Sequence, residues 1–414
     1  MDAVAHATEI VKKLVRAGYI AYFAGGWVRD YVMKHPSADV DIATNAPPEV
    51  ILDLFPRTIL VGLAFGVVIV AVNGHQFEVS TFRKDIGYTD GRKPDKIELT
   101  DPQEDAKRRD FTINGMFYDP LENEIYDYVD GMRDIKEGVI RTIGSPHERF
   151  VEDRLRMIRA IRFAARFGFV IDPETEKGIV ENADTLFPAV AMERVWQEFK
   201  KMASSVRFDW ALIEMHRMGL LPIIFPTLAV VHLKDIKHRV SPFPNFPKGC
   251  PTILYVMELF PDNTLDDLMA LCTYLKISVQ EARLLEFAYN AHKMLLNEAE
   301  AEKSRWVHFY VHPHSQTVLE AFAARLSPLD REAFLERNNL RRTELMHHIS
   351  RVDQKKPLVT SRDLLEYGIP PGKVMGILLK EAEQIAITHD LHAVTDVIVI
   401  LKKSPEWPPK ESTT

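Results

Sequence analysis

The pattern of hydrophobic and polar residues changes character near residue 140. Before that point, short β-branched and aromatic runs alternate with turns, as in AYFAG, DVDIAT, RTILVG, GVVIVAV and HQFEVSTF, and such runs are typical of strands. After it, strand-like runs almost vanish and apolar residues recur with the period of a helix. The pattern therefore predicts an α+β protein, in which a small N-terminal domain around a mixed or antiparallel sheet precedes a helical remainder.

Three local patterns refine this prediction. Ser145, Pro146 and Glu148 carry the signature of a helix start, a serine N-cap with proline at the first helical position and glutamate three residues on. A single helix is expected over the stretch VEDRLRMIRAIRFAARFGF, residues 151–169. The segment 232–251 is basic and rich in proline, which indicates a long loop.

Composition narrows the class of protein. A chain of 414 residues is too long for one compact core, so two to four domains are expected. Hydrophobic residues make up 46% and charged residues 27%, as in ordinary globular proteins. No apolar run approaches the roughly 18 residues of a membrane span, and no signal peptide is evident at the start. The two cysteines, without a CxxC pair, indicate neither a disulfide framework nor a zinc site, so we expect a cytoplasmic protein.

Two features of the N-terminal part point to phosphate and metal chemistry. In GGWVRD, Gly25 and Gly26 follow a predicted strand and would let the backbone approach a phosphate, with Arg29 adding a charged contact. Asp39 and Asp41 lie two apart on a β-type segment, so both side chains point to one side. Such a pair repels unless a cation such as Mg²⁺ lies between the two carboxylates.

Glu78, in the later strand HQFEVSTF, is a candidate third carboxylate. Together, glycines, paired aspartates and a distant acid are typical of two-metal phosphoryl or nucleotidyl transfer. The alternative for the aspartates alone is a solvated edge strand, and the alternative for the glycines alone is an ordinary turn.

The helix expected over 151–169 gathers arginines although the formal net charge of the chain is −7. At 100° per residue, one stripe holds Glu152, Arg156, Arg159, Phe163 and Arg166, flanked by Asp153 on one side and Arg162 on the other. A solvated helix with ion pairs would explain the charges, but not the surplus of arginine. Arginine offers a planar fork suited to phosphates and base edges.

Several ordered motifs resemble one family. GGWVRD with DVDIAT resembles the catalytic signature of the nucleotidyltransferase superfamily that includes DNA polymerase β. The later motifs STFRKDIGYTDGRKP, EDAKRRDFTINGMFYDP, DGMRDIKEGVIRTIG and VEDRLRMIRAIRFAARFGF are similar to the class II tRNA nucleotidyltransferases, the CCA-adding enzymes, and to their bacterial poly(A) polymerase relatives. AMERVWQEFKKM extends the resemblance.

The resemblance implies an architecture and an activity. A polymerase β-like catalytic head would span residues 1–140, a helical neck with the nucleotide-selecting helix 141–205, a helical body 206–330, and a tRNA-binding tail 331–414. The implied activity is template-independent addition of C and A to the 3′ end of tRNA from CTP and ATP, with release of pyrophosphate and with Mg²⁺ as cofactor. No membrane partner is expected.

The resemblance also assigns roles to residues. Asp39 and Asp41 would hold two Mg²⁺ ions, and Glu78 would be the third catalytic acid. Twelve further residues would contact the nucleotide or support those that do, and these are Gly25, Gly26 and Arg29 at the phosphates, Arg108, Arg109 and Asp110 of the RRD motif at the ribose with Asn114 nearby, Glu152, Asp153 and Arg156 at the base, Arg159 at the triphosphate, and Arg162 beside them.

Donor and acceptor chemistry explains how two residues can choose C and A. Both bases present an amino donor beside a ring-nitrogen acceptor, whereas guanine and uracil present a carbonyl beside an N–H. A carboxylate only accepts and a guanidinium only donates. Asp153 facing the amino group and Arg156 facing the ring nitrogen would therefore bind C or A and reject G or U. In this interpretation Glu152 orients the arginine.

The segment Asp85–Pro94 matches a mobile loop that the family ties to the switch from C to A. Its residues Asp85, Tyr88, Asp90, Gly91 and Arg92 are all present. Full CCA addition or A addition is therefore favoured over C addition alone. The alternative is a plain β-hairpin connection.

Contacts to tRNA are expected through shape and phosphates. The candidates are His238 and Arg239 in the expected loop, Arg337, Arg341 and Arg342 in RNNLRR, and the glycine turn GIPPGK over 368–373. Each is also compatible with a solvated surface charge.

Four alternatives stay open at this point. The enzyme would add only A, only two C residues, or a poly(A) tail. The fourth alternative is an RNA-binding protein on a degenerate polymerase scaffold. The intact set of Asp39, Asp41, RRD and Glu152–Asp153–Arg156 speaks against this last one.

Overall fold

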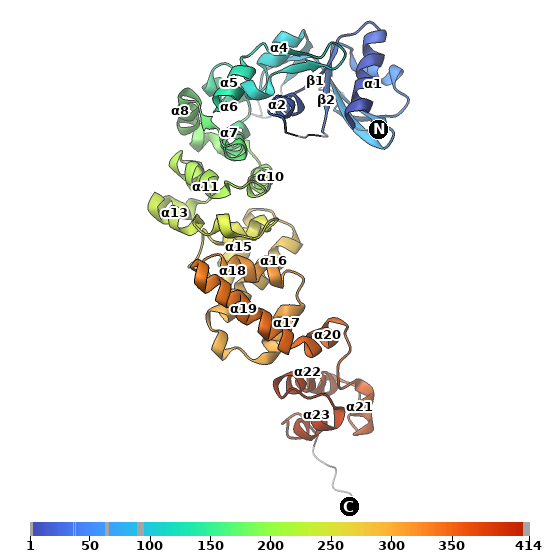
Figure 1. Cartoon of the computed structure of the whole chain (residues 1–414), viewed down its shortest axis with the longest axis vertical. Coiled ribbons are helices and arrows are strands. Elements are labelled where there is room, and N and C mark those ends of the chain that lie inside the picture. Colours follow the sequence, from blue (N-terminus) through green and yellow to red (C-terminus); the bar gives the residue numbers. More distant parts are fainter. Residues whose placement is uncertain (1–2, 36, 38, 63–65, 89–94, 409–414) are drawn as a thin grey trace, which may run out of the picture. The chain divides into compact units, whose positions relative to one another are not determined.

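The computed structural model describes residues 3–35, 37, 39–62, 66–88 and 95–408 (Figure 1). These residues form two compact units. The first comprises Met1–Val240 with Tyr274–Lys276, and the second comprises Ser241–Thr273 with Ile277–Thr414. The first unit thus joins the expected head to helices that follow it, and the finer division into four parts stays a prediction.

A mixed sheet forms the centre of the first unit, as the sequence predicted. Within the described residues it has seven strands in the order β3-β4-β5-β2-β1-β8-β9. Every neighbouring pair is antiparallel except β2 and β5, which are parallel. The strands are β1 (Ala21–Ala24), β2 (Asp41–Thr44), β3 (Thr58–Gly62), β4 (Val67–Val72), β5 (His75–Thr81), β8 (Phe117–Asp119) and β9 (Glu124–Tyr126).

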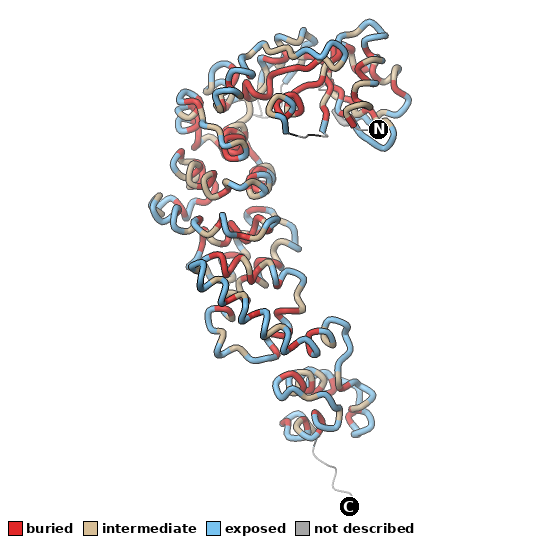
Figure 2. Tube along the Cα trace, in the orientation of Figure 1, coloured by how far each residue is buried: buried red, intermediate tan, exposed pale blue. Residues whose placement is uncertain are grey.

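Much of the sheet is buried (Figure 2), and its two faces pack against different residues. Alternation along β1 and β2 sends Phe23 and Ile42 into the larger core, which also holds residues of α1 (Ala3–Arg16) and α3 (Pro48–Leu54). Ala24 and Ala43 face the other side and pack with Ala106 of α4 (Pro102–Lys107). Asp41 has the parity of Ala43, so the sheet presents it on this second face.

Two short strands form a hairpin of their own, which the sequence analysis gave as the alternative to a mobile loop. β6 (Arg83–Ile86) pairs antiparallel with β7 (Lys96–Leu99). The expected mobile loop therefore begins on β6, which agrees with the hairpin alternative for its described ends. Asp90, Gly91 and Arg92 lie outside the described residues.

Helices dominate after residue 140, as predicted, and Ser145 caps the first of them with Pro146 at its first position. Two further short strands of the first unit are β10 (Val139–Ile140) and β11 (Val170–Ile171). The helices of this unit not yet named are α2 (Gly26–Val32), α5 (Gly131–Glu137), α6 (Pro146–Glu152), α7 (Leu155–Phe167), α8 (Pro173–Asn182), α9 (Leu186–Ala189), α10 (Met192–Ala203), α11 (Phe208–Arg217), α12 (Leu220–Ile224) and α13 (Leu233–Val240).

Two predictions of secondary structure, one of a helix and one of a loop, are wrong in detail. The helix expected over 151–169 is broken, because α6 ends at Glu152 and Asp153 is extended (φ −147°, ψ 103°). The Asp153 carboxylate accepts the Leu155 backbone N–H at 3.1 Å, a local bond that competes with a continuous helix. The loop expected over 232–251 contains α13, whose Ile236 and Val240 are buried one turn apart, so apolar packing outweighs the nearby prolines.

The second unit is helical. Its helices are α14 (Thr252–Met257), α15 (Leu265–Tyr274), α16 (Val279–Leu296), α17 (Lys303–Val311), α18 (Ser315–Ala323), α19 (Pro328–Glu344), α20 (Met346–Asp353), α21 (Ser361–Glu366), α22 (Lys373–Thr388) and α23 (Val394–Leu401). The last three helices share a hydrophobic cluster that includes Leu364, Leu378 and Ile398. In the part of the chain that the structure describes, no helix has the length and apolar character needed to cross a bilayer.

Candidate active site

An open cavity of about 370 Å³ lies in the first unit, where β1, β2, the segment after α4 and α7 meet. Most of the predicted nucleotide-binding residues line it. The lining residues are Gly25, Gly26, Arg29, Asp41, Arg108, Arg109, Asp110, Asn114, Asp153, Arg156, Arg159 and Phe163. The fold thus brings together motifs that are more than 100 residues apart in the chain.

The glycine pair forms the turn from β1 into α2. Gly25 has φ 65°, a conformation that side chains with a Cβ rarely adopt. A Cβ there would also lie 3.1 Å from Arg109 Nη1. Glycine is therefore needed both for the turn and for the close approach of Arg109.

The predicted carboxylates gather at the same end of β2. Ile42 of β2 is in register with Val79 of β5, so Asp41 and Glu78 lie on neighbouring parallel strands. Phe77 and Val79 face the larger core, which turns Glu78 to the face that carries Asp41. Asp39 precedes β2 and is exposed.

The charge state of Asp41 reflects this crowding. Burial, followed by the negative charges of Glu78 and Asp39, raises the pKa of Asp41 to about 7, although Arg109 acts in the opposite direction. A carboxylate with this environment favours a proton or a cation, and oxygen donors are the ligands that Mg²⁺ prefers. Within the described residues, no three His, Cys, Asp or Glu side chains come together closely enough to hold a metal by themselves. An ion at Asp41 would therefore complete its shell with phosphate and water oxygens.

Asp110 holds the RRD segment against α7. Its carboxylate accepts Arg159 Nε at 2.9 Å and Asn114 Nδ2 at 3.0 Å. Burial would raise the pKa of Asp110, but the charge of Arg159 and the hydrogen bond of Asn114 outweigh it and hold this pKa below its usual value. Asn114 Oδ1 in turn accepts Arg29 Nη1 at 2.6 Å, which links the glycine turn to the same network.

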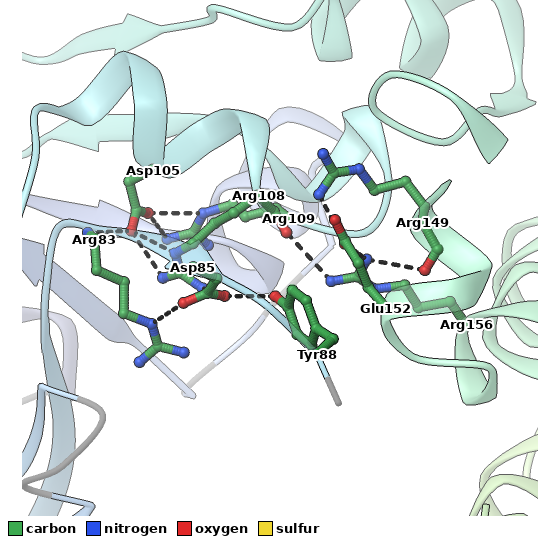
Figure 3. Close-up of polar contacts among 9 residues, drawn as sticks. All are labelled: Arg83, Asp85, Tyr88, Asp105, Arg108, Arg109, Arg149, Glu152 and Arg156. Carbon is green, nitrogen blue, oxygen red and sulfur yellow. Dashed lines mark hydrogen bonds and ion pairs between the residues drawn. The ribbon is translucent and has the colours of Figure 1, made fainter. Parts of the chain in front are cut away.

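The residues predicted to select the base lie around the break between α6 and α7, and Figure 3 shows the contacts of Glu152 and Arg156. Arg156 Nη1 donates to Glu152 Oε2 at 2.5 Å and to the Arg149 carbonyl at 3.1 Å, and Nη2 donates to the Arg108 carbonyl at 3.2 Å. Glu152 thus holds the Arg156 guanidinium by a hydrogen bond but does not line the cavity, and a part for this pair in base selection stays a prediction. These hydrogen bonds hold the Arg156 guanidinium in one orientation, and Arg156 and Asp153 both line the cavity.

Two residues near this wall were assigned no role by the sequence analysis, although Phe163 stood on the predicted arginine stripe. Arg194 of α10 donates to both oxygens of Asp153, at 3.3 and 2.9 Å. No spacing signal could have paired residues 41 positions apart. Phe163 lines the cavity, and the guanidinium carbon of Arg159 lies 5.3 Å from the centre of its ring.

Arg162 lies apart from the cavity, unlike the other predicted nucleotide-binding arginines. It is 7% exposed, and its Nε donates to Glu198 Oε2 of α10 at 2.5 Å. Its guanidinium is therefore used between α7 and α10, and a nucleotide contact of Arg162 stays a prediction.

The first residues of the expected mobile loop form a small polar cluster (Figure 3). Asp85 accepts Arg83 Nε at 2.9 Å and the Tyr88 hydroxyl at 2.9 Å, and its Oδ2 lies 3.8 Å from Arg108 Nη1. Burial, then the charge of Asp85, raises the pKa of Tyr88, so its hydroxyl stays protonated and donates. The loop thus begins in contact with the RRD segment.

The candidate tRNA-contacting residues in the second unit differ in whether their side chains are exposed or already engaged with neighbouring residues. Arg341 Nη2 lies 3.3 Å from Glu298 Oε2, and the guanidinium carbon of Arg341 lies 3.8 Å from the centre of the Trp306 ring, so Arg341 has a structural role. Arg337 lies 3.9 Å from Glu298. Lys373 is exposed at the first position of α22, directly after Gly372.

Comparisons with known proteins agree with this geometry. The family described as "Poly A polymerase head domain" matches residues 21–141, and the family described as "Probable RNA and SrmB- binding site of polymerase A" matches residues 168–231. A CCA-adding enzyme of Levilactobacillus brevis is 32% identical over 389 residues, which cover 93% of this chain and 94% of that protein. A CCA-adding enzyme of Bacillus subtilis is 44% identical over 197 residues, 47% of this chain and 49% of that protein.

A solved structure of the Bacillus stearothermophilus CCA-adding enzyme in complex with CTP is similar over 97% of both chains. Its TM-score is 0.74 and its sequence identity is 27%. The similarity therefore extends through both compact units of the present chain.

Proposed function

The chain belongs to the family of CCA-adding enzymes, and we propose that it adds C and A to the 3′ end of tRNA from CTP and ATP, with release of pyrophosphate. The observation that carries the proposal is that Asp153 and Arg156 share one cavity with Gly25, Gly26 and Asp41. A base-reading pair, a phosphate-binding turn and a reactive carboxylate are thereby within reach of one nucleotide.

The arrangement supports a division of labour. Asp153 and Arg156 would bind the Watson–Crick edge of C or A, with Glu152 and Arg194 fixing their orientation. Because a protein pair reads the base, no nucleic-acid template is needed. The mismatched edges of G and U would leave buried donors and acceptors unpaired, and this mismatch costs several kcal/mol.

The basic wall suits the triphosphate. The Gly25–Gly26 turn allows close approach of the phosphates, and Arg109 and Arg159 bring positive charge to the same cavity. Asp39 and Asp41 would hold Mg²⁺, which when bound activates the 3′-hydroxyl of tRNA and stabilises the charge on the triphosphate. The raised pKa of Asp41 supports this assignment, with Glu78 as the nearby third acid.

The cysteines are consistent with the predicted cytoplasmic location. Cys250 and Cys272 are buried and form no disulfide. This state is typical of proteins from reducing compartments.

The test uses three tRNA transcripts that end before CCA, after C and after CC, together with an unstructured RNA. Each is incubated with Mg²⁺ and CTP, ATP or both, and the products are resolved at single-nucleotide resolution. We expect completion of CCA on all three tRNAs, followed by a stop.

The other outcomes decide between the alternatives. Addition to the CC-ending tRNA alone would make the protein an A-adding enzyme, and a stop after two C residues would make it a CC-adding enzyme. A long A ladder on the unstructured RNA would indicate a poly(A) polymerase. Binding of tRNA without any addition would indicate a non-enzymatic RNA-binding protein.

A further inference from the structure

Asp105 is a buried carboxylate that the sequence analysis did not single out. It lies on α4, is 1% exposed, and stands three residues before the first arginine of the RRD motif. Its Oδ1 accepts Arg108 Nε at 2.8 Å, and its Oδ2 accepts Arg109 Nε at 3.2 Å and Nη2 at 3.0 Å. Each oxygen of one carboxylate therefore holds one of the two adjacent arginines (Figure 3).

These bonds determine where Arg109 points. With Nε and Nη2 on Asp105, Nη1 is the nitrogen left for the cavity, and it lies 3.1 Å from the position of a Cβ on Gly25. The guanidinium carbon lies 5.0 Å from the centre of the Phe117 ring, which supports the same orientation. Its charge also acts on Asp41. Arg109 thus lies between the glycine turn and the Asp41 carboxylate, where a triphosphate would bind.

The same carboxylate fixes Arg108 toward a different part of the site. Arg108 Nη1 lies 3.8 Å from Asp85 at the start of the expected mobile loop, and the Arg108 carbonyl accepts Arg156 Nη2 at 3.2 Å. Without Asp105, the two guanidinium groups would repel each other and sample many rotamers.

We propose that Asp105 is a positioning residue of the nucleotide site, which separates Arg108 from Arg109 and holds Arg109 toward the phosphates of the incoming CTP or ATP. The proposal rests on the proposed function. It adds a residue that touches no substrate and acts through Arg109.

The test is a double-mutant cycle for nucleotide binding. Asp105→Asn keeps one acceptor oxygen for the Arg83 backbone N–H, now 3.1 Å from Oδ1, but loses the charge and one acceptor. The dissociation constants of CTP and ATP with Mg²⁺, measured by calorimetry without tRNA, should rise roughly tenfold to a hundredfold. Arg109→Gln should have a similar effect. In the Arg109→Gln background, Asp105→Asn should change binding several-fold less than it does in the wild-type background, and the remaining change reflects Arg108.

Independent effects would overturn the proposal. If the losses of the two single variants multiply in the double variant, Asp105 does not act through Arg109. Glu104→Gln is the matched control, because Glu104 lies on the same helix and pairs with Lys107 at the surface, and it should bind nucleotides as the wild type does. Should Asp105→Asn fail to fold, the same cycle with Asp105→Glu, which keeps the charge and both oxygens, decides by the same criterion.

Failure of the proposed function is distinguishable from failure of this proposal. The first would appear as wild-type protein that adds no nucleotide to tRNA. The second would appear as wild-type protein that is active, together with binding losses that multiply in the double variant.

Discussion

At the scale of the residue, the site combines charges that would repel one another in isolation. Asp41 is buried within reach of the negative charges of Glu78 and Asp39, and burial together with this repulsion raises the pKa of Asp41 to about 7. Such an arrangement lowers the stability of the metal-free protein and favours a proton or a cation at Asp41. If Asp41 holds Mg²⁺ as proposed, function there is obtained at the expense of stability.

The pH dependence of stability follows from the sign of this shift. The folded-state pKa of Asp41 lies above its ordinary value of 3.8, so the folded state binds the proton more tightly than the unfolded state does. The resulting stabilisation is present below about pH 4 and is lost as the pH rises through about 7. Asp41 therefore destabilises the metal-free protein at neutral and higher pH.

Asp41→Asn should accordingly change stability and activity in opposite directions. At pH 8 without metal, the midpoint of thermal unfolding should rise by roughly 2–4 °C, because the charged form is no longer forced into the cluster. Nucleotide addition should fall at least a hundredfold. Scanning calorimetry and the tRNA extension assay measure the two effects. Glu49→Gln, an exposed change on α3, is the control, and an unchanged or lower midpoint for Asp41→Asn would refute the account.

At the scale of the element, the sequence specified much of the fold. Strands with a continuous apolar run, such as β4, or with apolar residues at alternate positions, such as β5, were predicted. The hairpin of β6 and β7 was predicted only as an alternative to a mobile loop, because its strands carry many charged residues, such as the paired Lys84 and Glu98. Hydrophobic periodicity carries no signal where neither face of a strand enters a core.

The candidate site could be predicted to the extent that its residues stand in ordered motifs. Asp105 had a usable signal, because it stands three and four residues before Arg108 and Arg109, the spacing of ion pairs over one helical turn, although α4 ends at Lys107. The bond between Arg194 and Asp153 had none, because only the packing of α10 beside α7 brings them together. The break at Asp153 was hidden, since an aspartate within a helical pattern reads equally well as a charged surface position.

The β6 start of the expected loop gives a prediction at this scale. Asp85→Asn weakens the contacts of Asp85 with Arg83 and Tyr88, and so loosens the loop from the RRD segment. If the loop governs the switch to A, the rate of A addition to CC-ending tRNA should fall about tenfold, while C addition changes less than about threefold. Single-turnover assays on both tRNAs measure this ratio.

The matched control for Asp85→Asn is a change on the other strand of the same hairpin. Glu98→Gln changes an exposed charge on β7 that pairs with Lys96, and both rates should stay as in the wild type. Equal losses of C and A addition in Asp85→Asn would mean that the contact supports the nucleotide site as a whole, without a role in the switch.

At the scale of the whole molecule, an acidic protein binds an acidic substrate through local patches. The formal net charge is −7, yet the cavity is lined by Arg29, Arg108, Arg109, Arg156 and Arg159. Recognition of tRNA by phosphate contacts similarly requires only a few exposed cations. Arg341 is used internally, so the glycine turn before α22 is the stronger candidate in the second unit.

Lys373→Gln tests this candidate. Loss of one phosphate contact should weaken tRNA binding a few-fold and reduce the slope of log affinity against log salt concentration by about one. Filter binding at several salt concentrations measures both quantities. Lys380→Gln, an exposed change farther along α22, is the control, and an unchanged salt slope for Lys373→Gln would exclude this contact. Binding of CTP and ATP should be unaffected in both variants.

The central claim is that Asp153 and Arg156 replace a nucleic-acid template. The most direct measurement is incorporation of each of the four nucleotides onto tRNA by Asp153→Ala, compared with the wild type under the same conditions. The account predicts that the variant incorporates U and G measurably and adds C and A more slowly, because the acceptor that excluded the wrong bases is gone. Strict selection of C and A at the wild-type rate would contradict it.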